Sequence, residues 1–365
     1  MEPRSNSRLV SLDAFRGFTV AAMIMVNYPG SWEHVFPTLR HTEWNGLTFT
    51  DQVAPYFLFI IGVSITLSLG GRRPGIDNWQ MYRRILWRSL KIFAIGMFLN
   101  AMPAFDLGNL RWTGTLHRIA VVFAISSILF LNTSVRQQAW ICAILLVGYW
   151  VAMTAIPTPG ETGVMLEPGR NLAAWVDRQY LPGRMWQGTW DPESLLSIIP
   201  CTATCLTGIL AGHLLASSLE TSEKLIRLMV GGVLSAVAGY FVGQHFPVNE
   251  NLWSTSFVLV TSGFAALVLG VFFYFMDIRR VTGWAQPGVW FGMNAITAYV
   301  MGDLLALIFY SLPIGGTSLN EHAVGAMTRA GILPELASWI YALCFVGVNA
   351  IPMYVLYRKR IFLKV

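Results

Sequence analysis

Ten long stretches without Asp, Glu, Lys or Arg divide this sequence and limit what it can fold into. A helix needs about 20 mostly apolar residues to cross the hydrocarbon core of a bilayer. Only 12% of the residues are charged, about half of the share usual in soluble domains. We therefore expect an all-α, polytopic membrane bundle, one domain over residues 1–365, with spans near 17–32, 52–71, 92–105, 119–135, 137–160, 194–219, 228–249, 251–276, 281–302 (continuing to about 312) and 336–357.

Basic residues are distributed unevenly between the two ends of these predicted helices. Ten spans put both termini on one side, and Lys and Arg gather on the cytosolic side of membrane proteins. With the N-terminus inside, 18 of the 25 basic residues lie at inner ends and loops, which leaves 7 outside. We therefore expect N-in, C-in topology and a basic inner rim formed by Arg4, Arg8, Arg16, Arg72, Arg73, Arg83, Arg84, Arg88, Lys91, Arg136, Lys224, Arg227, Arg279, Arg280, Arg358, Lys359, Arg360 and Lys364.

The outer loops are longer than the inner ones. Three of them cover about 30–50, 157–193 and 313–335. Long structured loops on one face indicate that something binds there. The first apolar run follows basic residues, as a signal peptide would, but no small-x-small cleavage site follows it, so we interpret it as a retained span.

Asp13 and Arg16 stand three residues apart at the entry of the first span and share a helix face. One interpretation is an interfacial salt bridge that anchors the helix. The other is a cytosolic anion site, which the basic residues around Lys359 would complete. Ionisable residues at membrane depth are functional candidates by default.

Asn27 closes the first span, and His41 follows fourteen residues later. Thr50 and Asp51 begin the second span, where Thr50 would cap the helix and Asp51 would suit its positive N-terminal dipole without any function. His41 has no such structural explanation. A histidine serves as general base or nucleophile near neutral pH, whereas a lone histidine is also a common polar rim residue.

Two arginines, Arg111 and Arg118, lie just before the predicted fourth span. If the helix extends back to Arg111, then Arg111, Gly114 and Arg118 lie on one stripe. They would hold an anionic or amide-bearing ligand, or pair with Asp106, Asp191 or Asp303. In Asp191-Pro192-Glu193, Asp191 is expected to cap the sixth span, with Pro192 at its first position.

Further along, Asn294 lies inside the ninth span, and Asp303, in the same apolar run, needs a partner or water.

Cys201 and Cys205 stand four residues apart, but no nearby histidine or third cysteine completes a set of metal ligands. We expect these two cysteines to be small buried hydrophobic residues and predict no metal site.

Four motifs near the N-terminus carry a family resemblance. Their order and spacing resemble the heparan-α-glucosaminide N-acetyltransferase family, and weaker likeness at 111–118, 171–178, 188–193 and 291–295 extends the resemblance over nearly the whole chain. The motifs are Ser11-Leu12-Asp13-Ala14-Phe15-Arg16-Gly17, Met25-Val26-Asn27-Tyr28, His41-x-x-Trp44-Asn45-Gly46-Leu47-Thr48-x-x-Asp51 and Pro55-Tyr56-Phe57-Leu58-Phe59-Ile60-Ile61-Gly62.

The resemblance implies a transmembrane acyltransferase that takes acetyl-CoA from the cytosol and acetylates an amino sugar or glycan hydroxyl on the far side. It implies that His41 is the catalytic histidine and Asn27 its companion. The Asn27 amide would polarise the thioester carbonyl while His41 removes a proton from the acceptor, or His41 would first carry the acetyl group itself. The acetyl-CoA residues expected on this basis are Asp13, Arg16, Arg111, Arg118, Asn294 and Lys359.

Two other functions remain open. Ten spans with buried Arg118 and Asp303 also suit a secondary transporter or flippase for a small anionic or sugar substrate, and a sensor or scaffold would keep the fold without catalysis. The short segment before the first motif favours a bacterial inner-membrane protein. The resemblance also implies a homodimer; no nucleic-acid partner is expected.

Overall fold

The computed structural model describes residues 9–70, 78–102, 105–311, 313–314 and 316–363. Within these residues, eight helices are long and apolar enough to cross a membrane, and one bent pair of helices brings the number to as many as nine. The predicted polytopic helical bundle is confirmed. Five residues assigned to the basic rim lie outside the described residues, namely Arg4, Arg8, Arg72, Arg73 and Lys364.

The described chain forms two compact units. The first unit comprises Met1–His41, Thr48–Val53 and Leu267–Lys364. Its elements are α1 (Val10–Asn27), the short helical turns η1 (Pro37–Leu39), η2 (Thr50–Gln52) and η5 (Gly283–Ala285), the π-helical η4 (Tyr274–Ile278), α10 (Gln286–Met293), α11 (Ala295–Ser311), the antiparallel strands β1 (Pro313–Ile314) and β2 (Thr317–Ser318), α12 (Leu319–Arg329) and α13 (Pro334–Arg358).

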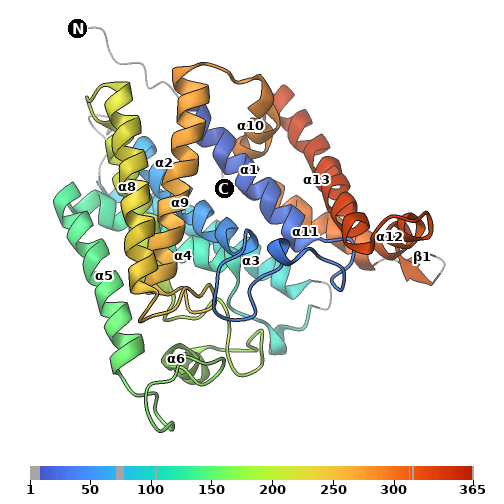
Figure 1. The fold of residues 1–365 in the computed structure, drawn as a ribbon, viewed down its shortest axis with the longest axis horizontal. Coiled ribbons are helices and arrows are strands. Elements are labelled where there is room, and N and C mark those ends of the chain that lie inside the picture. Colours follow the sequence, from blue (N-terminus) through green and yellow to red (C-terminus); the bar gives the residue numbers. More distant parts are fainter. Residues whose placement is uncertain (1–8, 71–77, 103–104, 312, 315, 364–365) are drawn as a thin grey trace. The chain divides into compact units, whose positions relative to one another are not determined.

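The second unit comprises Thr42–Leu47 and Ala54–Ala266. Its elements, coloured from light blue to amber in Figure 1, are α2 (Val53–Leu69), α3 (Asn78–Ala101), η3 (Leu107–Asn109), α4 (Thr115–Asn132), α5 (Val135–Ala155), α6 (Leu172–Tyr180), α7 (Ile198–Ala216), α8 (Thr221–Val242) and α9 (Thr255–Phe273), whose last turns belong to the first unit.

The limits of α1 depend on residues at both of its ends. The helix begins at Val10 rather than near 17, because the Asp277 carboxylate accepts hydrogen bonds from the N–H groups of Val10 (3.3 Å) and Ser11 (3.2 Å). These are two of the donors that a helix N-terminus leaves unpaired. The helix ends at Asn27, since Tyr28 has a non-helical backbone and Pro29 has no N–H to continue it.

Glycines allow α1 and α10 to touch backbone to backbone. A Cβ atom on Gly17 would lie 1.7 Å from the carbonyl oxygen of Gly288, and one on Gly292 would lie 1.8 Å from that of Asp13. Small residues at such crossings are typical of membrane helices. An apolar cluster that includes Ala14 completes this contact.

The expected continuous span over 281–312 is wrong. The chain bends by 79° between α10 and α11. Asn294 lies at the break with non-helical angles of φ −131° and ψ 44°. Its side-chain amide donates to the carbonyl oxygen of Ile361 (3.1 Å) and accepts from the N–H of Leu363 (2.9 Å), so it binds the chain that follows α13 instead of facing lipid.

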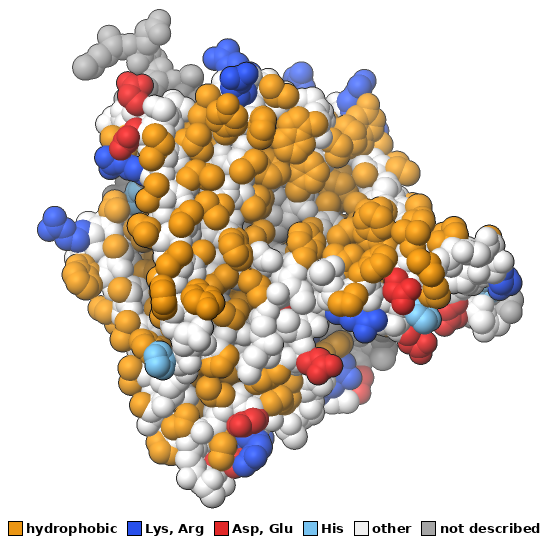
Figure 2. Space-filling model, in the orientation of Figure 1, with side chains coloured by type: hydrophobic (Ala, Val, Ile, Leu, Met, Phe, Trp, Pro, Cys, Tyr) orange, Lys and Arg blue, Asp and Glu red, His pale blue; other side chains and the backbone are white. Residues whose placement is uncertain are grey.

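The expected span at 92–105 also differs. Residues 92–101 of this range form the last turns of α3, whose preceding residues 78–91 carry four basic side chains. With these charges α3 is not among the described helices that are long and apolar enough to cross a membrane. In contrast, α8 is apolar on its outer surface, and Figure 2 shows hydrophobic side chains covering it. Such a surface suits contact with lipid. The exposed apolar residues of α8 are Ile226, Val230, Val233, Leu234, Val237, Tyr240 and Phe241.

Candidate active site

A histidine and a buried carboxylate meet in the first unit. Nδ1 of His41 lies 2.9 Å from Oδ1 of Asp51; the His41 side chain is 56% exposed and that of Asp51 is fully buried. The other carboxylate oxygen of Asp51 accepts the backbone N–H of Thr48 at 2.8 Å. The Thr48 hydroxyl lies 2.7 Å from the carbonyl oxygen of Arg40, so Thr48 links Asp51 to the segment before His41.

This geometry selects a tautomer of His41. Beside an ionised Asp51 carboxylate, which can only accept hydrogen bonds, a neutral His41 imidazole carries its proton on Nδ1 and its lone pair on Nε2. A buried carboxylate that orients an imidazole is the arrangement found behind general bases and nucleophiles. The His41–Asp51 pair is therefore chemically equipped to take a proton from a substrate or to attack an acyl carbon.

The sequence interpretation of this pair was incomplete. Asp51 does lie at the start of the second span, but its contact with His41 was missed; the only signal was a carboxylate ten residues after a histidine in a span-entry segment. The cap expected at Thr50 is wrong, because its hydroxyl is buried with no hydrogen-bond partner among the described residues.

Asn27 lies at the last position of α1, half-buried, and the chain after it is tightly held. The Tyr28 hydroxyl donates to the Asp303 carboxylate, which is the partner that Asp303 was expected to need. The N–H of Gly30 donates to the carbonyl oxygen of Ser338 in α13 at 3.2 Å. The turn that leads from Asn27 toward His41 is thus fixed by α11 and α13.

Four of the residues expected to bind acetyl-CoA lie at the end of α1 that is opposite to Asn27. They are Asp13, Arg16, Asn294 and Lys359. Arg16 forms an ion pair with Asp13, as one of the two interpretations of the sequence predicted. Tyr357, two residues before the exposed Lys359, packs on the cluster that contains Ala14, and Asn294 binds the chain just beyond. From Asp13 to Asn27 the helix rises about 21 Å, at about 1.5 Å per residue.

Arg111, in the second unit, is engaged by two carboxylates. Its guanidinium donates to both oxygens of Asp191, at 2.8 and 2.6 Å, and to Glu193, while it lies 5.0 Å from the centre of the Trp186 ring. Burial lowers the pKa of Arg111, but the hydrogen bonds that Arg111 donates to Asp191 and the two negative charges outweigh it and raise that pKa. Burial raises the pKa of Asp191, and the Arg111 guanidinium more than reverses this shift.

Two sequence expectations about this region are wrong. Asp191 does not cap the next span, because α7 begins at Ile198. Arg111 is not helical, since α4 begins at Thr115 after Gly114, whose φ of +145° favours glycine. The pairing of Arg111 with Asp191, one of the three carboxylates considered, is confirmed.

Arg118 is buried in α4 and has protein partners of its own. Its guanidinium donates to the carbonyl oxygen of Pro192 at 2.5 Å and to the Ser197 hydroxyl at 3.3 Å, and lies 4.5 Å from the centre of the Trp253 ring. Arg118 therefore ties the segment before α7 to α4 and to the turn before α9. Cys201, in α7, and Cys205 are buried free thiols, as predicted.

The fold and this site define a multi-pass membrane protein with an exposed histidine held by a buried carboxylate. Comparison with known proteins narrows the class. The family model for the catalytic region of heparan-alpha-glucosaminide N-acetyltransferase matches residues 8–246 of the sequence. The chain therefore belongs to this family. The family resemblance seen in the sequence is confirmed.

Two relatives carry the name heparan-alpha-glucosaminide N-acetyltransferase. The protein from Homo sapiens is 28% identical over 98% of this chain and 60% of its own length. The protein from Mus musculus is 26% identical over 99% of this chain and 61% of its own length. The chain thus spans about three fifths of the length of the curated relatives that it matches.

Proposed function

We propose that this chain is a transmembrane acetyltransferase that moves an acetyl group from acetyl-CoA to an amino sugar or glycan acceptor, with His41 as general base or acetyl carrier. The observation that carries the proposal is the hydrogen bond between His41 and the fully buried Asp51. It supports the proposal because it puts the basic lone pair on Nε2 of an exposed imidazole.

In the direct route, the acceptor nitrogen or oxygen attacks the thioester carbon while Nε2 of His41 takes its proton. The new C–N or C–O bond forms, the C–S bond breaks, and the thiolate of CoA leaves and takes the proton from His41. In the two-step route, Nε2 attacks the thioester carbon, the C–S bond breaks and CoA leaves as its thiolate. The acceptor then attacks the acetyl carbon, the bond from that carbon to Nε2 breaks, and the released Nε2 takes the proton of the acceptor and passes it to the thiolate. Asp51 stabilises the positive charge on His41, and the Asn27 amide donates to the developing oxyanion.

The donor would be held at the other end of α1. Arg16 and the exposed Lys359 suit the phosphates of CoA, with Asp13 orienting Arg16 and Asn294 holding the chain beyond α13. In the proposed N-in, C-in topology this end is cytosolic, in a bacterial inner membrane. Arg111 and Arg118 act indirectly, because protein groups already engage their guanidiniums.

The test is acetyl transfer by the purified, full-length protein in detergent, with glucosamine as acceptor and acetyl-CoA labelled in its acetyl group. We expect His41→Ala to abolish transfer while binding of acetyl-CoA persists. The matched control is His245→Ala, an exposed histidine of the second unit, which should transfer at the wild-type rate. Undiminished transfer by His41→Ala would remove the catalytic assignment.

A transporter or flippase is the second candidate function. The observation that favours it is the break at Asn294, because discontinuous helices form the substrate sites of many transporters. Substrate flux into proteoliposomes without CoA and without an acetylated product would support transport in place of acetyl transfer.

A further inference from the structure

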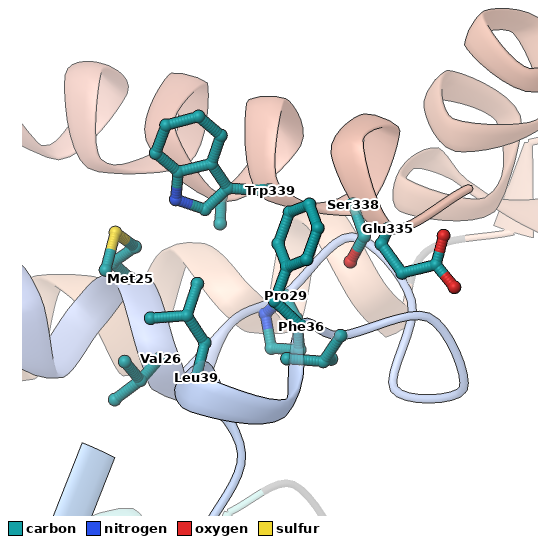
Figure 3. Close-up of a pocket in the computed structure, with 10 residues that line it drawn as sticks. Met25, Val26, Pro29, Phe36, Leu39, Glu335, Ser338 and Trp339 are labelled. Carbon is teal, nitrogen blue, oxygen red and sulfur yellow. The ribbon is translucent and has the colours of Figure 1, made fainter. Parts of the chain in front are cut away.

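The small pocket of the first unit has no room for an organic ligand. It lies where the chain after α1 meets the first turns of α13, and Figure 3 shows Met25, Pro29 and Trp339 among its lining side chains. Its cavity of about 20 Å³ accommodates about one water molecule. A surface of the second unit, on α3, is better suited to bind a ligand.

One face of α3 packs along α4, its neighbour in Figure 1. The buried residues of α3 are Ile85, Ile92, Gly96 and Ala101. The Tyr82 hydroxyl donates to the side-chain oxygen of Asn132 at 2.7 Å. The Ser89 hydroxyl donates to the carbonyl oxygen of Ala120 at 2.7 Å. These bonds fix the first half of α3 against α4, so its other face points away from α4.

Four exposed basic side chains gather on this other face. They form a basic cluster of Arg83, Arg84, Arg88 and Lys91. Arg84, Arg88 and Lys91 stand at i, i+4 and i+7 and so lie on one side of the helix, over a rise of about 10 Å. Neither α3 nor α4 contains Asp or Glu. Within the part of the chain that the structure describes, no carboxylate forms an ion pair with Arg83, Arg84 or Lys91, so their positive charge is available to an anion.

Apolar side chains form a stripe next to the basic cluster. Trp79, Leu86 and Leu90 are exposed and stand at i, i+7 and i+11, so they share one side of the helix. The exposed Trp87 lies between this apolar stripe and the basic cluster, and the Lys91 ammonium lies 5.9 Å from the centre of its ring. Tryptophan favours the boundary between the hydrocarbon core of a membrane and water. The first half of α3 therefore has the surface of a helix that lies at this boundary.

This combination suits an anionic phospholipid. Guanidinium and ammonium groups donate charge-assisted hydrogen bonds to phosphate oxygens. Each basic side chain near the membrane surface adds to the attraction for anionic headgroups. The acyl chains of the same lipid cover the apolar stripe, which the phosphates of a soluble nucleotide would leave exposed to water.

We propose that the exposed face of the first half of α3 is a binding site for anionic phospholipid. The basic cluster holds the headgroup phosphate, and Trp79, Leu86 and Leu90 contact the acyl chains. In the proposed N-in topology α3 begins on the cytosolic side, where anionic lipids are found. The proposal does not depend on acetyl transfer, because no step of that reaction uses α3.

Native mass spectrometry of the full-length protein in detergent measures the Kd of the first lipid bound. The probes are phosphatidylglycerol and phosphatidylcholine with the same acyl chains. We expect wild type to bind phosphatidylglycerol about tenfold more tightly than phosphatidylcholine. The triple variant Arg83→Gln, Arg84→Gln and Lys91→Gln should weaken phosphatidylglycerol about tenfold and leave phosphatidylcholine unchanged. Leu86→Gln together with Leu90→Gln should weaken both lipids.

A matched control removes the same number of charges elsewhere. Arg136→Gln, Arg279→Gln and Arg280→Gln change exposed side chains outside α3, and this variant should bind both lipids as wild type does. Arg83→Lys together with Arg84→Lys keeps the charge and should retain the preference for phosphatidylglycerol. Retention would show that the loss in the triple variant comes from charge and not from misfolding.

Two lipid results would overturn the proposal. They are equal affinity of wild type for the two lipids, and the same loss of phosphatidylglycerol binding in the triple variant and in the matched control. Acetyl-CoA, whose phosphates would also be attracted to the basic cluster, is tested in the same way. We expect the triple variant to bind acetyl-CoA with wild-type affinity. Lost affinity for acetyl-CoA with unchanged affinity for phosphatidylglycerol would make the cluster a nucleotide site and refute the lipid site.

Discussion

Nδ1 of His41 and Oδ1 of Asp51 lie 2.9 Å apart, with the imidazole exposed and the carboxylate fully buried. Asp51 is held in turn by the N–H of Thr48. A buried acceptor in a fixed position keeps the imidazole in one orientation and one tautomer. Any reaction at Nε2 of His41 therefore depends on Asp51.

Asp51→Asn should lower the rate of acetyl transfer while leaving the fold intact. The amide has nearly the same shape, but it has no charge to stabilise the imidazolium and allows the wrong tautomer of His41. Loss of such a carboxylate from a catalytic pair lowers kcat by about 10²-fold or more. Initial rates with labelled acetyl-CoA measure this, with Glu33→Gln, an exposed carboxylate of the same loop, as control. A rate for Asp51→Asn equal to that of the control would exclude this role.

Gly292→Ala should destabilise the first unit strongly. Its new Cβ would meet the backbone of Asp13 at 1.8 Å, so α1 and α10 must separate. Overpacking of this kind costs about 1–3 kcal/mol or more. Thermal unfolding in detergent checks this against Gly231→Ala in α8, where nothing lies within 4 Å of the new Cβ. Equal midpoints for the two variants would show that this close helix contact is absent.

Arg111→Met should unfold at a lower temperature than wild type, because it leaves the fully buried Asp191 without its ion-pair partner. Breaking a buried ion pair by removing one partner costs about 3–5 kcal/mol. Arg170→Met, which breaks the exposed pair between Arg170 and Glu161, is the control and should change the midpoint little. A midpoint for Arg111→Met no lower than that of Arg170→Met would contradict the described pairing.

The free energy of unfolding of the wild type should depend on pH through Asp177. The substitution Asp177→Asn should remove this dependence. Burial raises the pKa of Asp177 from 3.8 to about 6, although hydrogen bonds from Leu195 and Ser194 partly oppose the shift. Because the folded state holds this proton more tightly, the stabilisation is complete below about pH 4 and is lost as the pH rises through about 6. A shift of this size corresponds to about 2–3 kcal/mol.

The measurement is the difference in unfolding midpoint between wild type and Asp177→Asn from pH 4 to pH 8. Taking the difference cancels the opposite trend from Asp191, whose pKa is lowered by Arg111. We expect wild type to lose stability relative to the variant between pH 4 and pH 6 and then to stay level. A constant difference would mean that the pKa of Asp177 is not raised.

The sequence predicts those features that depend on residues close together in the chain. Long apolar runs predict most of the membrane-spanning helices, and the three-residue spacing of Asp13 and Arg16 predicts their ion pair. N-in, C-in topology and a single domain stay predictions. The four N-terminal motifs were enough to identify the family.

The features that could not be predicted depend on side chains far away in the chain. The start of α1 is set by Asp277, 266 residues after Ser11. The break at Asn294 accompanies hydrogen bonds to residues at least 67 positions later. No pattern of apolar residues encodes such contacts, so a continuous helix was the natural expectation from periodicity.

The most direct test of the central claim uses proteoliposomes with labelled acetyl-CoA only outside and glucosamine only inside. Because the protein inserts into the vesicles in both orientations, some molecules have the end that binds acetyl-CoA on the outside. We predict that wild type forms N-acetylglucosamine inside the vesicles and that His41→Ala forms none although it still binds acetyl-CoA. Product formed only when donor and acceptor share a compartment, or formed equally by His41→Ala, would contradict the account.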